Sequence, residues 1–366
     1  MNILFIIDSL HSIEAGSERQ IYKLIDGLVS SGHKVSLILL RHTDFSRRLE
    51  AFPCAWESLD IGSIASANAF RTMLHLRHRV KQQKVDVIHA YFPDACILAP
   101  LFLKTSNNLL ITSRRDMGLI YRGKPAWIYR LLARRTDVVV SNSKAVSDFT
   151  GDKENLPASK RRVIGNGIEE YSSAKEAPQI FLNQTSNKLI LVANVKPVKR
   201  TLDAVIAVSQ LIEEGEDLEL ALVGELQDKQ YAEKITALIA ERKLEQRIHL
   251  TGSLREPRRI LSQANIGLLI SESEGLSNTI MEYMDAGLPV IATRVGGNPE
   301  LVANNENGLL IEKGDIHQLK AAILLLINNL PLQKSLGASG KSQIQKEFSV
   351  AALIRKHEAL YSRASC

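Results

Sequence analysis

The sequence predicts an α/β protein with two doubly wound domains in tandem, and three observations carry that prediction. Apolar runs of strand length alternate with amphipathic segments of helix length along nearly the whole chain. A polar, aperiodic stretch at residues 171–187 interrupts the alternation once. The chain has 366 residues, which suggests two domains at about 150 residues each. We therefore expect two Rossmann-like domains facing across a cleft, with ligands beyond the carboxyl ends of the parallel strands.

Residues 1–170 are expected to form the first domain. Its predicted strands are short, almost continuous apolar runs, as in a sheet covered on both faces, at Asn2–Ile7, Val35–Leu40, Val85–Ile88, Leu109–Thr112 and Val138–Ser141. Its predicted helices have apolar residues at helical spacing, at Ser17–Ser30, Ala67–Val80 and Ala126–Arg135. Gly32 follows the first of these helices and is a common C-terminal stop.

Residues 171–187 are expected to be a linker, residues 188–346 the second domain, and residues 347–366 a final helical segment. The predicted strands of the second domain are Lys188–Val192, Leu218–Val223, His249–Leu250, Ile266–Ile270 and Val290–Ile291. The predicted helices of this half are Leu202–Glu213, Gln230–Arg242, Pro257–Gln263, Asn278–Ala286, Gln318–Asn328 and Val350–Leu360.

The positive charge is concentrated in the first half of the chain. Residues 1–183 carry 25 Lys and Arg against 18 Asp and Glu, whereas residues 184–366 carry 21 against 22. The basic stretches at 71–84 and 114–135 favour an anionic partner, either a membrane surface or a substrate. A plain solvated helix face explains residues 71–84 equally well. Nucleic acid is not expected, because no interleaved aromatics or binding motif accompany these stretches.

Several classes of protein are excluded by what the sequence lacks. The longest apolar run, Ala95–Leu103, is too short to span a membrane, and the N-terminus does not resemble a signal peptide. Cys54, Cys96 and Cys366 offer neither a disulfide framework nor metal-ligand spacing, which fits the cytoplasm. No dinucleotide fingerprint, P-loop, paired-aspartate or H-E-x-x-H motif occurs. We therefore predict no cofactor and no metal.

The segment Ser271–Met284 is the strongest candidate site. A strand ends near its start, a loop with Gly275 follows, and a helix is expected from about Ser277. The free amides of a helix start make an anion site, here expected near Ser277 or Asn278. Glu274 precedes the turn and Glu282 lies about one turn into the helix. Two carboxylates beside such a site suit an anion that carries polyols on both sides. Alternatively, both glutamates merely favour the first half of a helix.

The loop that follows the first strand of each domain is a further candidate binding site. In the second domain, residues 193–200 include Lys196, Lys199 and Arg200, three cations that could neutralise a diphosphate; a solvated loop is the alternative. In the first domain, Gly16 permits close approach of a ligand to the start of a helix. The alternative there is an ordinary helix start capped by Ser17.

Together these segments resemble the retaining glycosyltransferases of family 4, also called glycosyl transferases group 1, which have the GT-B fold. The resemblance rests on the E-x7-E pair Glu274 and Glu282 and on five shorter stretches, at Gly296–Val302, Asn307–Leu310, Val163–Ile168, Asp86–Ala90 and Ser141–Ser143. It covers about the whole chain, and it implies that the final helix, within residues 347–366, crosses back onto the first domain.

The resemblance implies roles for individual residues. Glu274 would hold sugar hydroxyls near the anomeric centre and so be catalytic, Glu282 would hold the ribose, and Lys199 would bind the diphosphate. The full implied donor site is Gly16, Asn194, Lys199, Gly252, Leu254, Glu274, Gly275, Leu276, Ser277, Asn278, Thr279 and Glu282.

Three departures from the family pattern affect this site. Ala15 stands where the family often has a first glycine before Gly16. Asn194 replaces the arginine that usually accompanies the diphosphate lysine, and Lys196 or Arg200 could substitute for it.

The third departure lies in the first domain. Arg114 replaces a histidine placed near the transferred sugar, and it could stabilise leaving-group charge as a catalytic residue or bind an acceptor phosphate. The acceptor-side candidates are therefore His89, Arg114 and Arg115, although His89 is equally consistent with a buried structural residue.

The implied activity is that of a retaining, metal-independent hexosyltransferase. It would move a sugar from a nucleoside diphosphate donor, with UDP favoured, to a hydroxyl of a lipid-linked or polysaccharide acceptor in cell-surface glycan biosynthesis. The expected location is the cytoplasm, peripherally at the inner face of the membrane. Two alternatives stay open: a sugar-nucleotide epimerase on the same fold, and a non-catalytic sugar-nucleotide-binding protein.

Overall fold

The computed structural model describes residues 1–14, 16–171, 177–183, 187–254 and 256–362, and its chain divides into two compact units. Unit 1 consists of Met1–Gly167 together with Val350–Cys366, and unit 2 consists of Ile168–Ser349. The expected linker, residues 171–187, belongs to unit 2, and its residues 172–176 and 184–186 lie outside the described residues.

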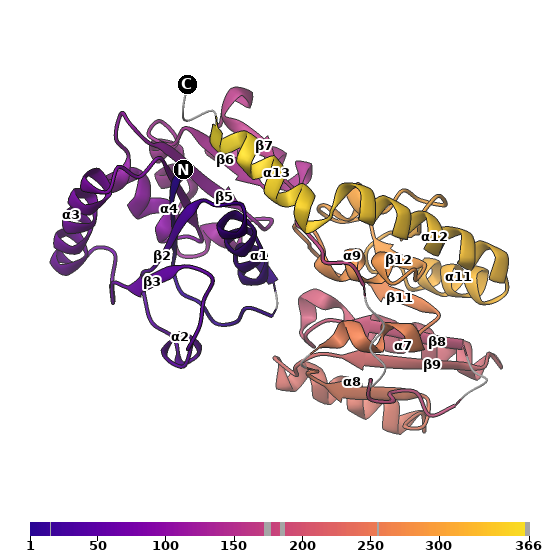
Figure 1. The fold of residues 1–366 in the computed structure, drawn as a ribbon. Helices are drawn as coiled ribbons and strands as arrows, with labels where there is room; N and C mark the ends of the chain where they lie inside the picture. The colour runs from indigo at the N-terminus through magenta and orange to yellow at the C-terminus, as the bar shows by residue number, and fades with distance from the viewer. Residues whose placement is uncertain (15, 172–176, 184–186, 255, 363–366) are drawn as a thin grey trace. The chain divides into compact units, whose positions relative to one another are not determined.

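Unit 1 contains a seven-stranded sheet in the order β3-β2-β1-β4-β5-β6-β7, and all of its strand pairs are parallel (Figure 1). The strands are β1 Asn2–Ile7, β2 Lys34–Leu39, β3 Ala55–Ser58, β4 Val87–Tyr91, β5 Leu109–Arg114, β6 Val138–Ser141 and β7 Arg161–Val163. Side chains alternate across this sheet: Ile3 and Phe5 are buried on one face, and Leu4 and Ile6 on the other. This two-sided burial explains why the strands are almost continuously apolar.

Helices cover both faces of this sheet. The face of Ile3 and Phe5 packs against α1 Gly16–Ser30 and α13 Val350–Tyr361. These two helices lie side by side, the first in indigo and the second in yellow in Figure 1. The opposite face packs against α3 Ala67–Gln82, α4 Ala95–Leu98 with the π-turn Ala99–Leu103, and α5 Ala126–Leu132. Also in unit 1 are α2 Asp44–Arg47, α6 Lys144–Glu154 and the 3-10 turns Leu119–Tyr121 and Ala158–Lys160.

Unit 2 contains a six-stranded parallel sheet in the order β10-β9-β8-β11-β12-β13. The strands are β8 Asn187–Val192, β9 Leu218–Val223, β10 Ile248–Gly252, β11 Ile266–Leu269, β12 Val290–Thr293 and β13 Leu309–Ile311. One face packs against α7 Thr201–Glu213, α8 Lys229–Glu241 and α11 Ile316–Ile327. The other packs against α9 Asn278–Asp285 and α12 Leu330–Glu347. The short elements of this unit are α10 Asn298–Leu301 and the 3-10 turns Pro197–Lys199 and Pro257–Gln263.

Every predicted strand exists, with ends shifted by at most a few residues. The helix predicted at Pro257–Gln263 exists with these bounds and is a 3-10 helix. The sequence interpretation missed α6, α12 and the edge strands β3, β7 and β13.

Candidate active site

The carboxyl ends of the strands of unit 2 bring two of the predicted residues into direct contact. Lys199 ends the 3-10 turn after β8, and Glu274 lies in the loop after β11. Lys199 Nζ lies 2.6 Å from Glu274 Oε1, and the two side chains keep 23% and 12% of their exposure. Ser271 donates from Oγ to the same carboxylate oxygen over 2.6 Å. Glu274 is therefore held by a cation and a hydroxyl while it stays open to solvent.

The loop after β12 supports Glu274 from its backbone side. Gly296 has φ +50°, and a β-carbon at this position would lie 1.7 Å from the carbonyl oxygen of Glu274. The amide of Gly297 donates to the carbonyl of Gly275 over 2.9 Å. Thr293 donates from Oγ1 to the carbonyl of Ser271 over 2.7 Å. The sequence did not predict a role for these supporting residues, although Gly296 and Gly297 belong to one of the stretches that carry the family resemblance.

Helix α9 begins as predicted and is docked onto the end of β8. Ser277 is its N-cap and accepts from the amide of Ile280 over 3.2 Å. The hydroxyl of Tyr283 accepts from the amide of Val192 over 2.6 Å, and Thr279 donates to the carbonyl of Val192 over 3.3 Å. The helix start, which Asn278 opens after the buried Leu276, therefore lies at the same sheet edge as Lys199. Glu282, one turn further on, is 8% exposed.

Asn194 and Gly252 meet at the loop that follows β9. The Asn194 Oδ1 accepts from the amide of Glu225 over 3.3 Å, and the carbonyl of Gly252 accepts from the amide of Gly224 over 3.0 Å. Leu254 is partly buried and packs against the core cluster that includes α9. All three residues thus lie on unit 2, and within the described part of the chain no hydrogen bond or ion pair joins them to Glu274.

Arg200 is engaged elsewhere. It donates to Asp203 over 2.7 Å and to Glu272 over 2.8 Å, and Lys313 lies 2.7 Å from the same Glu272. Lys313 and then Arg200 hold the pKa of Glu272 below its ordinary value. Arg200 therefore has two carboxylate partners, whereas Lys196 forms no ion pair with any residue that the structure describes.

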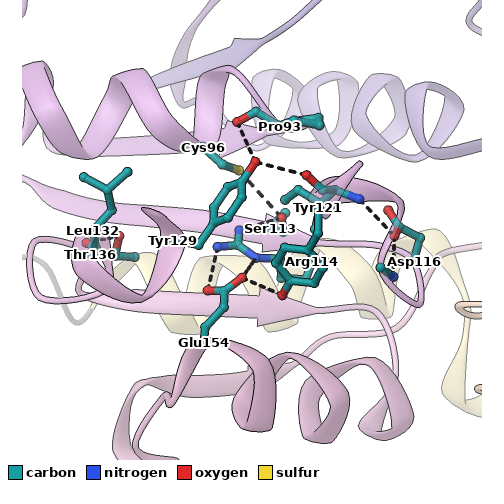
Figure 2. A network of polar contacts seen from close by, with 12 residues as sticks. Pro93, Cys96, Ser113, Arg114, Asp116, Tyr121, Tyr129, Leu132, Thr136 and Glu154 are labelled. Carbon is teal, nitrogen blue, oxygen red and sulfur yellow. Dashed lines mark hydrogen bonds and ion pairs between the residues drawn. The ribbon is translucent and has the colours of Figure 1, made fainter. Parts of the chain in front are cut away.

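In unit 1, Arg114 forms a buried ion pair with Glu154 (Figure 2). Its Nε and Nη2 donate to the two carboxylate oxygens over 2.7 and 2.9 Å, and Tyr121 donates to Glu154 over 2.8 Å. The guanidinium lies 5.2 Å from the centre of the Tyr129 ring. Arg114 is 3% exposed and Glu154 is fully buried.

This geometry favours a structural role for Arg114 over the expected catalytic or phosphate-binding one. Burial alone lowers the pKa of Arg114, but the neighbouring Glu154 outweighs burial and raises it. The charge is therefore already matched inside the unit, where it ties β5 to α6. The sequence could not reveal this pairing, because Glu154 lies 40 residues away.

Arg115, the next residue, has no carboxylate partner among the described residues. Its guanidinium donates to Asn166 Oδ1, and its Nε is buried without a hydrogen-bond partner. Burial lowers the pKa of Arg115, and the nearby Tyr91 opposes this effect. Of the two adjacent arginines, Arg115 is therefore the one whose charge no described carboxylate neutralises.

His89 is fully buried, which favours its structural interpretation. Its Nδ1 lies 2.7 Å from the hydroxyl of Tyr361 and its Nε2 lies 2.8 Å from the hydroxyl of Ser113. Burial, reinforced by the nearby His357 and Arg115, holds the pKa of His89 well below its ordinary value. A neutral His89 therefore joins β4 and β5 to α13.

Gly16 opens α1 with φ +63°, and a β-carbon there would meet no atom within 4 Å. Glu18, in the first turn, accepts from the amides of His11 and Ser12 over 2.8 and 3.1 Å and closes the preceding loop. Ala15, where the family often has a glycine, lies outside the described residues.

No group of three or more His, Cys, Asp or Glu side chains among the described residues could hold a metal ion. None of the helices in the described part of the chain is long and apolar enough to cross a membrane.

Comparison with known proteins gives the same picture along the whole chain. Residues 15–170 match the family model of glycosyltransferase family 4, and residues 172–343 match that of glycosyl transferases group 1. The N-acetyl-alpha-D-glucosaminyl L-malate synthase of Bacillus anthracis is 28% identical over 77% of this chain and 75% of its own. An Escherichia coli protein, UDP-Gal:alpha-D-GlcNAc-diphosphoundecaprenol alpha-1,3-galactosyltransferase, is 22% identical over 82% of this chain and 81% of its own.

Among solved structures, Anabaena HepE in complex with UDP superimposes with a TM-score of 0.85 at 18% identity, covering 99% of this chain and 100% of its own. This likeness places both parallel sheets in one known architecture, the GT-B fold. The chain is a group 1 glycosyltransferase and belongs to family 4.

Proposed function

We propose that this glycosyltransferase moves a hexose from a UDP-sugar to a hydroxyl of a lipid-linked or polysaccharide acceptor, with retention at the anomeric carbon and without a metal. The observation that carries this proposal is the 2.6 Å contact between Lys199 and Glu274 at the carboxyl edge of the sheet. In a sugar nucleotide the sugar is bonded directly to the second phosphate. A phosphate-binding cation and a hydroxyl-binding carboxylate must therefore be neighbours.

The chemistry follows from these groups. The bond between the anomeric carbon and the phosphate oxygen breaks, and the acceptor oxygen bonds to the same carbon from the same face. The acceptor proton passes to the departing phosphate. Lys199 and the amides at the start of α9 would meet the negative charge that grows on the diphosphate. We assign no described residue at this edge as a covalent nucleophile. The nearest candidate, Glu274, is hydrogen-bonded to Lys199 and Ser271.

UDP is the donor nucleotide we favour, since HepE binds UDP and the Escherichia coli relative is named for UDP-Gal. Thermal-shift screening against UDP-, GDP- and ADP-sugars tests this choice, because a ligand that binds only the folded protein raises the melting temperature. If only GDP- or ADP-sugars raised the melting temperature, the donor nucleotide would be GDP or ADP instead of UDP. Activity that survives dialysis against EDTA is expected for a reaction without a metal.

The two glutamates should separate binding from turnover. Glu282→Ala should weaken the melting shift given by UDP, because it removes the expected ribose contact. Glu274→Ala should keep much of that shift and lose turnover. Glu245→Ala, an exposed site on the same unit, is the matched control. If both active-site variants bound and reacted like the parent, the assignment would be wrong.

Product analysis by NMR separates the remaining possibilities. An α-linked product from an α-linked donor supports retention, and inversion contradicts it. A donor epimerised without consumption of acceptor would favour the epimerase. Donor binding without turnover in any lipid extract would favour a non-catalytic binding protein.

On the acceptor side we propose that Arg115, not Arg114, receives an anionic group. Its buried guanidinium lacks a carboxylate, and a bound phosphate would supply the missing charge. Arg115→Met should raise the KM for the acceptor, and Arg115→Lys should recover part of the loss. If the methionine variant instead loses the UDP melting shift and keeps its acceptor KM, the anion is a donor phosphate.

A further inference from the structure

The outer face of α5 exposes large apolar side chains. Trp127 is 64% exposed and Leu131 is 59% exposed, although both belong to a helix that packs on a core. Positions four apart lie on one side of a helix, and so does the exposed Arg130 between them. Arg134, three residues after Leu131 and just beyond the end of α5, is also exposed. We call Trp127, Arg130, Leu131 and Arg134 the α5 face.

The opposite side of α5 fixes this orientation. Tyr129 and Leu132 are 1% and 4% exposed and belong to the hydrophobic core on the face of the sheet that α3, α4 and α5 cover. The Tyr129 hydroxyl donates to the carbonyl of Ile120 over 3.1 Å. The helix is thus anchored by one side, and its apolar outer side contributes nothing to that anchoring.

The surroundings of the α5 face are strongly basic. Residues 117–136 contain no aspartate or glutamate. Four arginines of this stretch are exposed and form no ion pair with any residue in the described ranges: Arg122, Arg130, Arg134 and Arg135. Lys124, by contrast, is neutralised by Asp94 at 2.7 Å. The positive charge around Trp127 is therefore available to an outside partner.

We propose that the α5 face docks on an anionic phospholipid bilayer. Tryptophan and arginine suit the interface, since the indole sits at the headgroup level and the guanidinium pairs with phosphate. Arginines around two protruding apolar side chains complement a surface that is negative above and apolar below. The inference rests on the proposed function in one respect: a lipid-linked acceptor would have to be reached at such a surface.

Vesicle sedimentation tests the docking directly. The protein should bind vesicles of phosphatidylglycerol and phosphatidylcholine and should not bind phosphatidylcholine alone. Arg130→Gln/Arg134→Gln should lower the partition coefficient by about fivefold for each arginine removed. Trp127→Ser/Leu131→Ser should lower it by at least tenfold. Leu330→Ser and Lys334→Gln, exposed positions on unit 2, should leave it unchanged.

Fluorescence localises the contact, because the chain has two tryptophans. Trp56→Phe leaves Trp127 as the reporter, and its emission should shift to shorter wavelength on anionic vesicles. In 1 M salt, where the Debye length falls to about 3 Å, the shift should be lost.

Equal vesicle binding by Trp127→Ser/Leu131→Ser and the parent would overturn the docking surface, as would equal binding to phosphatidylcholine. The melting shift given by UDP keeps this test separate from the proposed function. It should be the same in the Trp127→Ser/Leu131→Ser variant and the parent. Vesicle binding without any sugar-nucleotide shift would leave the surface standing and refute the donor assignment.

Discussion

Replacing Arg114 with methionine should destabilise the protein rather than simply slow its reaction. The change removes two charge-assisted hydrogen bonds from Glu154 and leaves that fully buried carboxylate with the Tyr121 hydroxyl alone. Breaking a buried ion pair from one side costs about 3–5 kcal/mol. We therefore expect the free energy of unfolding to fall by about 3–5 kcal/mol.

Calorimetry measures this loss as a melting temperature lowered by about 9–15 °C, taking about 3 °C per kcal/mol for a unit of this size. The double variant Arg114→Met/Glu154→Leu should recover most of the stability, since an apolar pair can replace a buried ion pair. A methionine variant that melts like the parent but has no turnover would refute the structural role and restore the catalytic one.

Two further perturbations test other parts of the structure. Gly296→Ala should displace the Glu274 loop and abolish the UDP melting shift, because its β-carbon would lie 1.7 Å from the Glu274 carbonyl; Gly215→Ala, also at positive φ but in open space, should leave the shift intact. Burial raises the pKa of Asp8 from 3.8 to about 6. Ionisation of Asp8 should therefore lower the melting temperature as the pH rises from about 4 to 6. In the Asp8→Asn variant the melting temperature should change less over that range.

The fold followed from the sequence where burial is two-sided and periodic. Strands such as β1 and β9 have apolar residues on both faces and stood out as continuous runs. The 18-residue helix α12 did not stand out, because two of its buried positions, Gly337 and Gly340, are glycines that let it approach the segment 284–307 closely. Close packing of backbones leaves no apolar signature in the sequence.

The site was predictable in part for a similar reason. Lys199 and Glu274 each follow a strand of one parallel sheet, so their loops must share an edge. Arg114 also follows a strand, yet its partner comes from the end of a distant helix. Strand position predicts which edge a residue occupies; it does not predict which neighbour neutralises its charge.

The assembly of unit 1 from two separated stretches has a consequence for biosynthesis. Its first 167 residues leave the ribosome long before α13, whose Tyr361 completes the hydrogen bonds of His89. Until then the apolar face of α1 and the sheet that α13 covers stays exposed while unit 2 is being translated. A nascent chain stalled before residue 350 should therefore expose that face to chaperones and proteases, and a supplied peptide of the final helix should protect it.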